Sequence, residues 1–143
     1  MKSLQEFYHI AQQNNVVVDH FELRKRAALS VMDDDGDCFV AIDPKQITYD
    51  TDERNKLAHE LGHCLTGSFY NQYAAVDCRR RHENTADKWA IGELIPPEAL
   101  DQAVADGCTE LWDLAEHFGV PEDFMRKAVC WYVHGNLATE LYF

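Results

Sequence analysis

Apolar positions in the first fifth of the chain follow a helical and then an extended spacing. A first helix is predicted to end around Asn14, and a short strand begins within residues 16–18. The apolar positions of the helix are Leu4, Phe7, Tyr8 and Ile10. The chain therefore opens with an amphipathic helix that leads into a strand.

The next segment has the pattern of a β-hairpin. Two apolar runs, residues 27–32 and 38–42, are separated by the acidic stretch 33–37, which contains an Asp-Gly pair. Glycine tolerates positive φ, so Asp-Gly between two β-type runs is typical of a tight turn. The acidic stretch does not fit an EF-hand calcium loop, because Pro44 occupies the twelfth position, where that loop needs a glutamate. We interpret it as a solvated turn.

A long helix is predicted to begin near Asp50, with this residue as N-cap and Glu53 as its capping-box partner. Gly67 is expected to end it. A polar loop over residues 68–81 and a second helix over residues 82–93 should follow.

The last part of the chain predicts further helices. Pro96 and Pro97 interrupt the chain, and Pro97 suits the first position of a helix. Two shorter helices are predicted over residues 111–117 and 121–132. The expected fold is α+β, with a small antiparallel sheet of about three strands packed against a helical bundle. We expect one domain over residues 1–143, with a catalytic core in 1–97 and C-terminal helices in 98–143 that pack on it.

Composition narrows the choice of partners and compartment. The formal net charge of −12 disfavours direct binding to nucleic acid or to an anionic membrane. No stretch approaches the ~18 apolar residues of a membrane span, and the N-terminus lacks the pattern of a signal peptide. The five cysteines are odd in number and include no CxxC pair. We therefore expect a cytoplasmic protein without a disulfide framework or a thiolate zinc site, and with Cys64 packed against its neighbours.

The segment HELGH, residues 59–63, carries the chemistry. On a helix His59 and His63 share one face, so both imidazoles can bind one zinc ion. Glu60 lies beside the position of a bound water, where it can serve as the catalytic base. A chance match on a surface helix is the alternative, but the apolar residues Leu57 and Ala58 before the motif favour the metal site.

A catalytic zinc site needs a third protein ligand and one open position. Glu83 is the favoured ligand, with His82 as a rival and a helix-dipole role as the alternative. Asp87 lies on the same helix face as Glu83 and can accept a hydrogen bond from the outer ring nitrogen of a ligating histidine. Tyr70, Tyr73 and His82 are candidates for stabilising the oxyanion or contacting substrate. The basic run 79–81 could bind an acidic substrate segment, although a solvated run is the simpler interpretation.

These motifs resemble those of the ImmA/IrrE family of metallopeptidases. The helix with AHELGH is followed by a loop and then, over residues 83–96, by the pattern E-x-x-A-D-x-W-A-x-x-x-L-I-P. In the family an asparagine is commoner at the position of Asp87. The resemblance implies that His59, His63 and Glu83 bind one zinc ion and that Glu60 is the base. It also implies that the substrate is a helix-turn-helix repressor, whose cleavage derepresses phage, mobile-element or stress-response genes.

Two other classes of function remain open. Residues 111–121 have the outline of a helix-turn-helix, which would make this a DNA-binding regulator. Six acidic and only two basic side chains occur in residues 108–143, however, and phosphate groups would repel that charge. A zinc-bound antirepressor that acts by binding alone is the other class, although it would have no need of Glu60.

Overall fold

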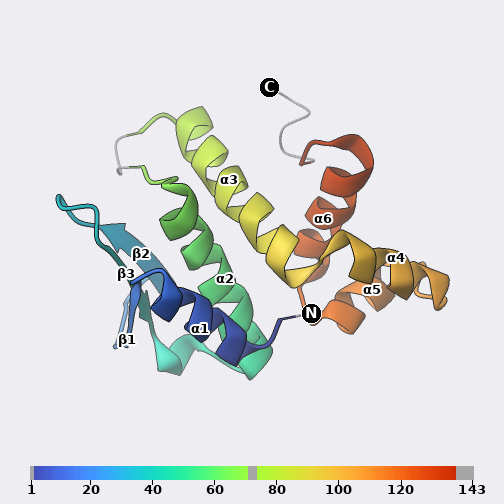
Figure 1. Cartoon of the computed structure of the whole chain (residues 1–143), viewed down its shortest axis with the longest axis horizontal. Helices are drawn as coiled ribbons and strands as arrows, with labels where there is room; N and C mark the ends of the chain where they lie inside the picture. The colour runs from blue at the N-terminus through green and yellow to red at the C-terminus, as the bar shows by residue number, and fades with distance from the viewer. Residues whose placement is uncertain (1, 71–73, 138–143) are drawn as a thin grey trace. The chain divides into compact units, whose positions relative to one another are not determined.

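The computed structural model describes residues 2–70 and 74–137. Its internal contacts divide the chain into two compact units, residues 2–90 and residues 91–143. The first unit contains the sheet and the HELGH segment, and the second contains the C-terminal helices (Figure 1). Whether the whole chain acts as one domain stays a prediction.

A three-stranded mixed sheet lies in the first unit. The strands are β1 (Val17–His20), β2 (Ala28–Met32) and β3 (Cys38–Ile42), in the order β1-β3-β2. The β2–β3 hairpin is antiparallel, as predicted, but β1 pairs with β3 in parallel. The chain reverses once after β1 to reach the far edge and again to insert β3 in the centre, so β1 and β3 run in the same direction. The α+β class is confirmed, while the expectation of a wholly antiparallel sheet is wrong.

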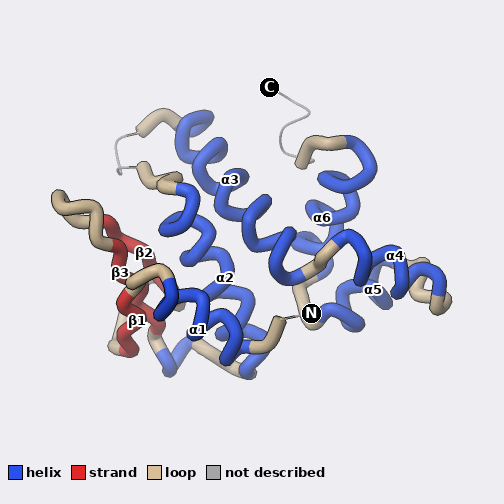
Figure 2. Tube along the Cα trace, viewed as in Figure 1, coloured by secondary structure: helices blue, strands red, loops and turns tan. Residues whose placement is uncertain are grey.

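Helices α1 (Leu4–Gln13) and α2 (Asp50–Thr66) form a layer beside this sheet (Figures 1 and 2). A capping box between Ser3 and Glu6 starts α1, because each side chain accepts a hydrogen bond from the other residue's backbone N–H. The largest fully buried apolar side chains of this unit include Phe7, Ile42, Leu57 and Leu61. Burial of these side chains holds α2, and therefore the HELGH segment, against the strands.

The start of α2 differs from the prediction. Tyr49 is the N-cap and makes no side-chain capping bond, while Asp50 is already helical. Glu53 accepts a hydrogen bond of 2.9 Å from the Tyr8 hydroxyl of α1 instead of closing a capping box. The Glu53 side chain, which the local pattern assigned to the helix cap, is therefore bound by Tyr8 of another helix. The predicted end is confirmed, because Gly67 is the C-cap with φ 67°.

Helix α3 (Val76–Leu94) begins earlier than the predicted residue 82. The basic run 79–81 is thus helical instead of part of a polar loop. Arginine is a good helix former, and Asp77 in the first turn favours the positive end of the helix dipole. The prediction of a polar loop as far as residue 81 is therefore wrong, because α3 already begins at Val76.

A disulfide joins Cys38 at the start of β3 to Cys64 in α2, with their Cα atoms 5.9 Å apart. The expectation that the cysteines are unbridged, with Cys64 only a packing residue, is wrong. The two residues are 26 positions apart and meet only because α2 packs on β3. Cys78, Cys108 and Cys130 are free thiols.

The second unit contains α4 (Pro97–Ala105), α5 (Leu111–Phe118) and α6 (Glu122–His134). Pro97 occupies the first turn of α4, as predicted. Gly119, in the left-handed conformation with φ 66°, ends α5 before the turn into α6. Within the described residues, no helix is both long and apolar enough to cross a membrane.

Candidate metal centre

Two histidines of α2 and one glutamate of α3 meet within the first unit. The Nε2 atom of His59 lies 2.7 Å from Oε2 of Glu83, and the Nε2 atom of His63 lies 3.3 Å from Oε1 of the same carboxylate. Donor atoms of the three residues all lie within 4.8 Å of one another. Helical periodicity explains the histidine pair, since side chains four positions apart share a face. The structure brings Glu83 to that face, as the sequence predicted.

The outer ring nitrogens of both histidines have acceptors. Nδ1 of His59 lies 2.9 Å from Oδ1 of Asp87, which is 7% exposed. Nδ1 of His63 hydrogen-bonds the backbone carbonyl of Ser68, just beyond the helix end at Gly67. Each acceptor can hold a proton on Nδ1, so Nε2 is the ring nitrogen that can bind a metal ion.

Gly62 sets the separation of α2 and α3, the two helices that carry the histidines and Glu83. A Cβ atom at this position would lie 2.5 Å from the carbonyl oxygen of Ala86 in α3. Any larger residue would therefore push α3 away from α2. The glycine of HELGH lets the carboxylate of Glu83 reach the two imidazoles.

The histidines and the glutamate of this cluster shift one another's pKa. Burial alone would lower the pKa of His59, but hydrogen bonds to Asp87 and Glu83 outweigh it and raise the pKa to about 10. Burial would likewise raise the pKa of Glu83, yet hydrogen bonds from His59, His63 and Tyr70 hold it well below its ordinary value. The cluster thus favours a positive charge between the rings and the carboxylate.

This donor set fits a zinc ion. Two imidazole nitrogens and one carboxylate are the ligands of several catalytic zinc sites, and the outer acceptors already orient both rings. His59, His63 and Glu83 could therefore hold a metal ion. A divalent cation bound there would supply the positive charge beside Glu83 that the protonated imidazoles otherwise supply.

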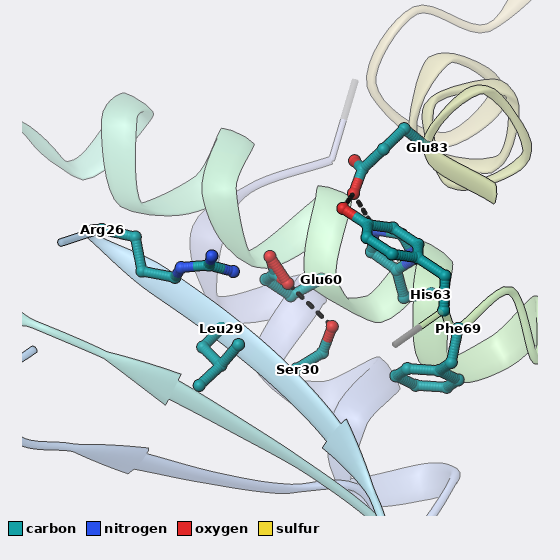
Figure 3. Close-up of a pocket in the computed structure, with 8 residues that line it drawn as sticks. Arg26, Leu29, Ser30, Glu60, His63, Phe69 and Glu83 are labelled. Carbon is teal, nitrogen blue, oxygen red and sulfur yellow. Dashed lines mark hydrogen bonds and ion pairs between the residues drawn. The ribbon is translucent and has the colours of Figure 1, made fainter. Parts of the chain in front are cut away.

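A pocket of about 190 Å³ opens beside the cluster. Glu60, 9% exposed, contributes to its wall and accepts a hydrogen bond of 2.8 Å from the Ser30 hydroxyl of β2 (Figure 3). Strand β2 thereby orients the Glu60 carboxylate. The lining residues are Arg26, Leu29, Ser30, Glu60, His63, Phe69, Tyr70 and Glu83.

The remaining predicted contacts differ in how close they lie to the cluster. The Tyr70 hydroxyl donates a hydrogen bond of 2.7 Å to Oε1 of Glu83. Burial and this carboxylate raise the pKa of Tyr70 to about 12, so the hydroxyl keeps its proton at neutral pH. His82 stacks on the Tyr70 ring, with centroids 6.2 Å apart, and does not belong to the donor set. Tyr73 lies outside the described residues.

Comparison with known proteins bears on the identity of this centre. Residues 20–129 match the family model of M78 peptidases, described as the IrrE N-terminal-like domain. The chain belongs to the M78 peptidase family. A search of curated proteins found no match. The matched segment contains β2, β3, the HELGH helix of this M78 domain and Glu83, so the resemblance to ImmA/IrrE proteins is confirmed.

Sequence reasoning missed three parts of the M78 site: the Ser68 carbonyl, the Ser30 hydroxyl and Arg26. The Gly67 helix stop was a signal for Ser68, because a left-handed cap folds the following residue back toward the last turn. Ser30 and Arg26 carried no such signal. They reach the site only because β2 lies at the sheet edge beside α2.

Proposed function

We propose that this M78 domain is a zinc-dependent endopeptidase that cleaves a helix-turn-helix transcriptional repressor. The observation that carries the proposal is the convergence of His59, His63 and Glu83 around one position, with both outer ring nitrogens held. Membership in a peptidase family supports hydrolysis as the reaction. The metal would be bound through the two Nε2 atoms and the Glu83 carboxylate.

A zinc ion bound there would act as a Lewis acid toward a peptide carbonyl and lower the pKa of an adjacent water molecule. Glu60 would accept a proton from that water and deliver it to the leaving amine. Its carboxylate belongs to the pocket wall and is oriented by Ser30, which supports this role. Tyr70 keeps its proton and lies next to the ligand Glu83, so it could donate a hydrogen bond to the developing oxyanion.

The repressor substrate follows from the family resemblance and is consistent with the charge of the chain. A formal net charge of −12 favours a basic protein partner over free nucleic acid. DNA-binding repressors carry basic surfaces, so an acidic peptidase can approach them without repulsion. Cleavage would derepress the genes that the repressor controls.

The proposal is tested with Glu60→Gln and with Glu116→Gln as a matched control, because Glu116 is exposed on α5 outside the pocket. Each zinc-loaded variant is incubated with helix-turn-helix repressors from the same organism, starting with any that a neighbouring gene encodes. We expect all proteins to bind one zinc ion and only Glu60→Gln to lose cleavage by at least ~100-fold. Wild-type protein that binds zinc but cuts nothing would contradict the peptidase assignment.

The same variants separate the other two functions. If Glu60→Gln still derepresses a reporter gene in cells, the protein acts as a zinc-bound antirepressor without cleavage. If the wild-type protein alone retards operator DNA at low salt, the α5–α6 pair binds DNA directly. We expect neither result, because six acidic side chains oppose two basic ones in residues 108–143.

A further inference from the structure

The pocket beside the metal ligands includes an arginine that the proposed chemistry does not use. Within the described part of the chain, Arg26 is the only lysine or arginine that lines this pocket. Its guanidinium points toward Glu60 across the pocket (Figure 3). A positive charge therefore faces the position where a substrate would lie.

The backbone that carries Arg26 is held in place. Gln46 donates hydrogen bonds of 2.9 Å to the carbonyl oxygens of Leu23 and Arg26. Asp43, 2% exposed, accepts from the Leu23 N–H, and its own N–H donates to the Ala27 carbonyl at 2.8 Å. The loop before β2 is thus fixed to the turn after β3, and Arg26 has a defined place at the rim of the pocket.

The side chain itself is exposed and available to a ligand. Among the residues that the structure describes, no hydrogen bond or ion pair engages the guanidinium of Arg26. The nearby carboxylate of Glu60 already accepts a hydrogen bond from Ser30. An arginine with unused donors beside a substrate pocket is suited to bidentate binding of a carboxylate.

The position of Arg26 distinguishes a specificity role from a catalytic one. Tyr70, whose hydroxyl contacts Glu83, is the donor nearer to the metal ligands. Arg26 is exposed and lines the pocket without belonging to the cluster of His59, His63 and Glu83. Long-range attraction of acidic peptides is also disfavoured, because the net charge of −12 repels them. Any preference for acidic residues must therefore come from short-range contact.

We propose that Arg26 determines substrate specificity by binding the carboxylate of an aspartate or glutamate adjacent to the scissile bond. This inference rests on the proposed peptidase function and adds a substrate feature to it. The anchored loop and the unused donors carry it. A charge-assisted hydrogen bond at this place corresponds to a preference of about tenfold to a hundredfold for an acidic side chain over its amide.

The cleavage test uses zinc-loaded full-length protein and a tryptic peptide library from a denatured cell extract, with cleavage sites read by mass spectrometry. Arg26→Gln is compared with Arg24→Gln, because Arg24 is exposed in the same loop but does not line the pocket. We expect wild type and Arg24→Gln to favour Asp or Glu at one position beside the cleaved bond. Arg26→Gln should lose that preference about tenfold to a hundredfold while still cutting peptides with Asn or Gln there. Arg26→Glu should shift the preference to Lys or Arg.

Three results of the cleavage test would overturn the inference. The first is an acidic preference that survives in Arg26→Gln, and the second is the absence of such a preference in wild type. The third is an equal loss of cleavage for every peptide, with circular dichroism unchanged, which would place Arg26 in catalysis.

A binding test keeps the inference separate from the peptidase proposal. The same library is passed over immobilised Glu60→Gln protein that carries either Arg26→Gln or Arg24→Gln. Retention of acidic peptides should fall about tenfold or more only with Arg26→Gln. If wild type cuts nothing while this difference holds, the peptidase function fails and the carboxylate site stands. If the two double variants retain the same peptides, the carboxylate site is refuted.

Discussion

Replacing Gly62 by alanine tests whether the close approach of α2 and α3 builds the metal centre. Helix propensity alone would make the alanine variant more stable by about 1 kcal/mol, because alanine has a higher helix propensity than glycine. Here the new Cβ would lie 2.5 Å from the Ala86 carbonyl oxygen, whereas ordinary contacts begin at 3.4 Å. The neighbour is backbone and cannot rotate away, so the helices must separate by several tenths of an ångström.

The cost of that separation decides the sign of the effect. Overpacking a buried site costs roughly 1–3 kcal/mol, which is set against the propensity gain of about 1 kcal/mol, so we expect a net loss of up to about 2 kcal/mol in the free energy of unfolding. The metal site should suffer as well, because α2 carries both histidines and α3 carries Glu83. Binding sites tolerate displacements of only about 0.5 Å, so zinc affinity should fall at least ~10-fold.

Gly92→Ala is the matched control. Gly92 also lies within a helix, α3, but an added Cβ there would meet no atom within 4 Å. This variant should be up to about 1 kcal/mol more stable than wild type and bind zinc unchanged. Urea denaturation of the proteins, made metal-free with a chelator, gives the free energies of unfolding. Competition with a chromophoric chelator gives the zinc affinities. A Gly62→Ala protein as stable as Gly92→Ala, with wild-type zinc affinity, would refute the reasoning.

Three further changes test other contacts. Asp87→Ala removes the acceptor of the His59 Nδ1–H and should weaken zinc binding about 10- to 100-fold in the same competition assay, whereas Thr85→Ala, exposed on the same helix, should not. Reduction of the Cys38–Cys64 disulfide, whose cysteines have a sequence separation of 26, should lower the free energy of unfolding by up to about 3.5 kcal/mol, and an unchanged urea midpoint would contradict this. The control Cys78→Ser, which replaces a free thiol, should leave the stability unchanged. Hydrogen bonds from Gln46 and the Leu23 N–H lower the pKa of Asp43 below its ordinary 3.8, so its charge stabilises the fold above pH 3.8 and this contribution disappears as pH falls through the lowered pKa. The stability difference between wild type and Asp43→Asn should therefore shrink below about pH 3.8, and a constant difference in urea titrations from pH 6 to 2.5 would rule this out.

Local periodicity determined most of the ligand set. Positions four apart on a helix share a face whatever the rest of the fold, so HELGH placed His59 and His63 together and the second motif placed Glu83 with Asp87. Turn and break signals were also sufficient for the β2–β3 hairpin, for the end of α2 at Gly67 and for the start of α4 at Pro97. These features depend on residues close to one another in the chain.

Tertiary packing decided what depends on distant segments. The parallel pairing of β1 with β3, the Cys38–Cys64 bridge and the diversion of Glu53 to Tyr8 each join residues that no local pattern connects. The rim of the site likewise arises because an edge strand lies beside α2, which brings Ser30 to Glu60 and Arg26 to the pocket. Sequence alone thus determined which residues can bind the metal. The packing of α2 against α3 and the sheet decided how those residues are held and which substrate groups they would meet.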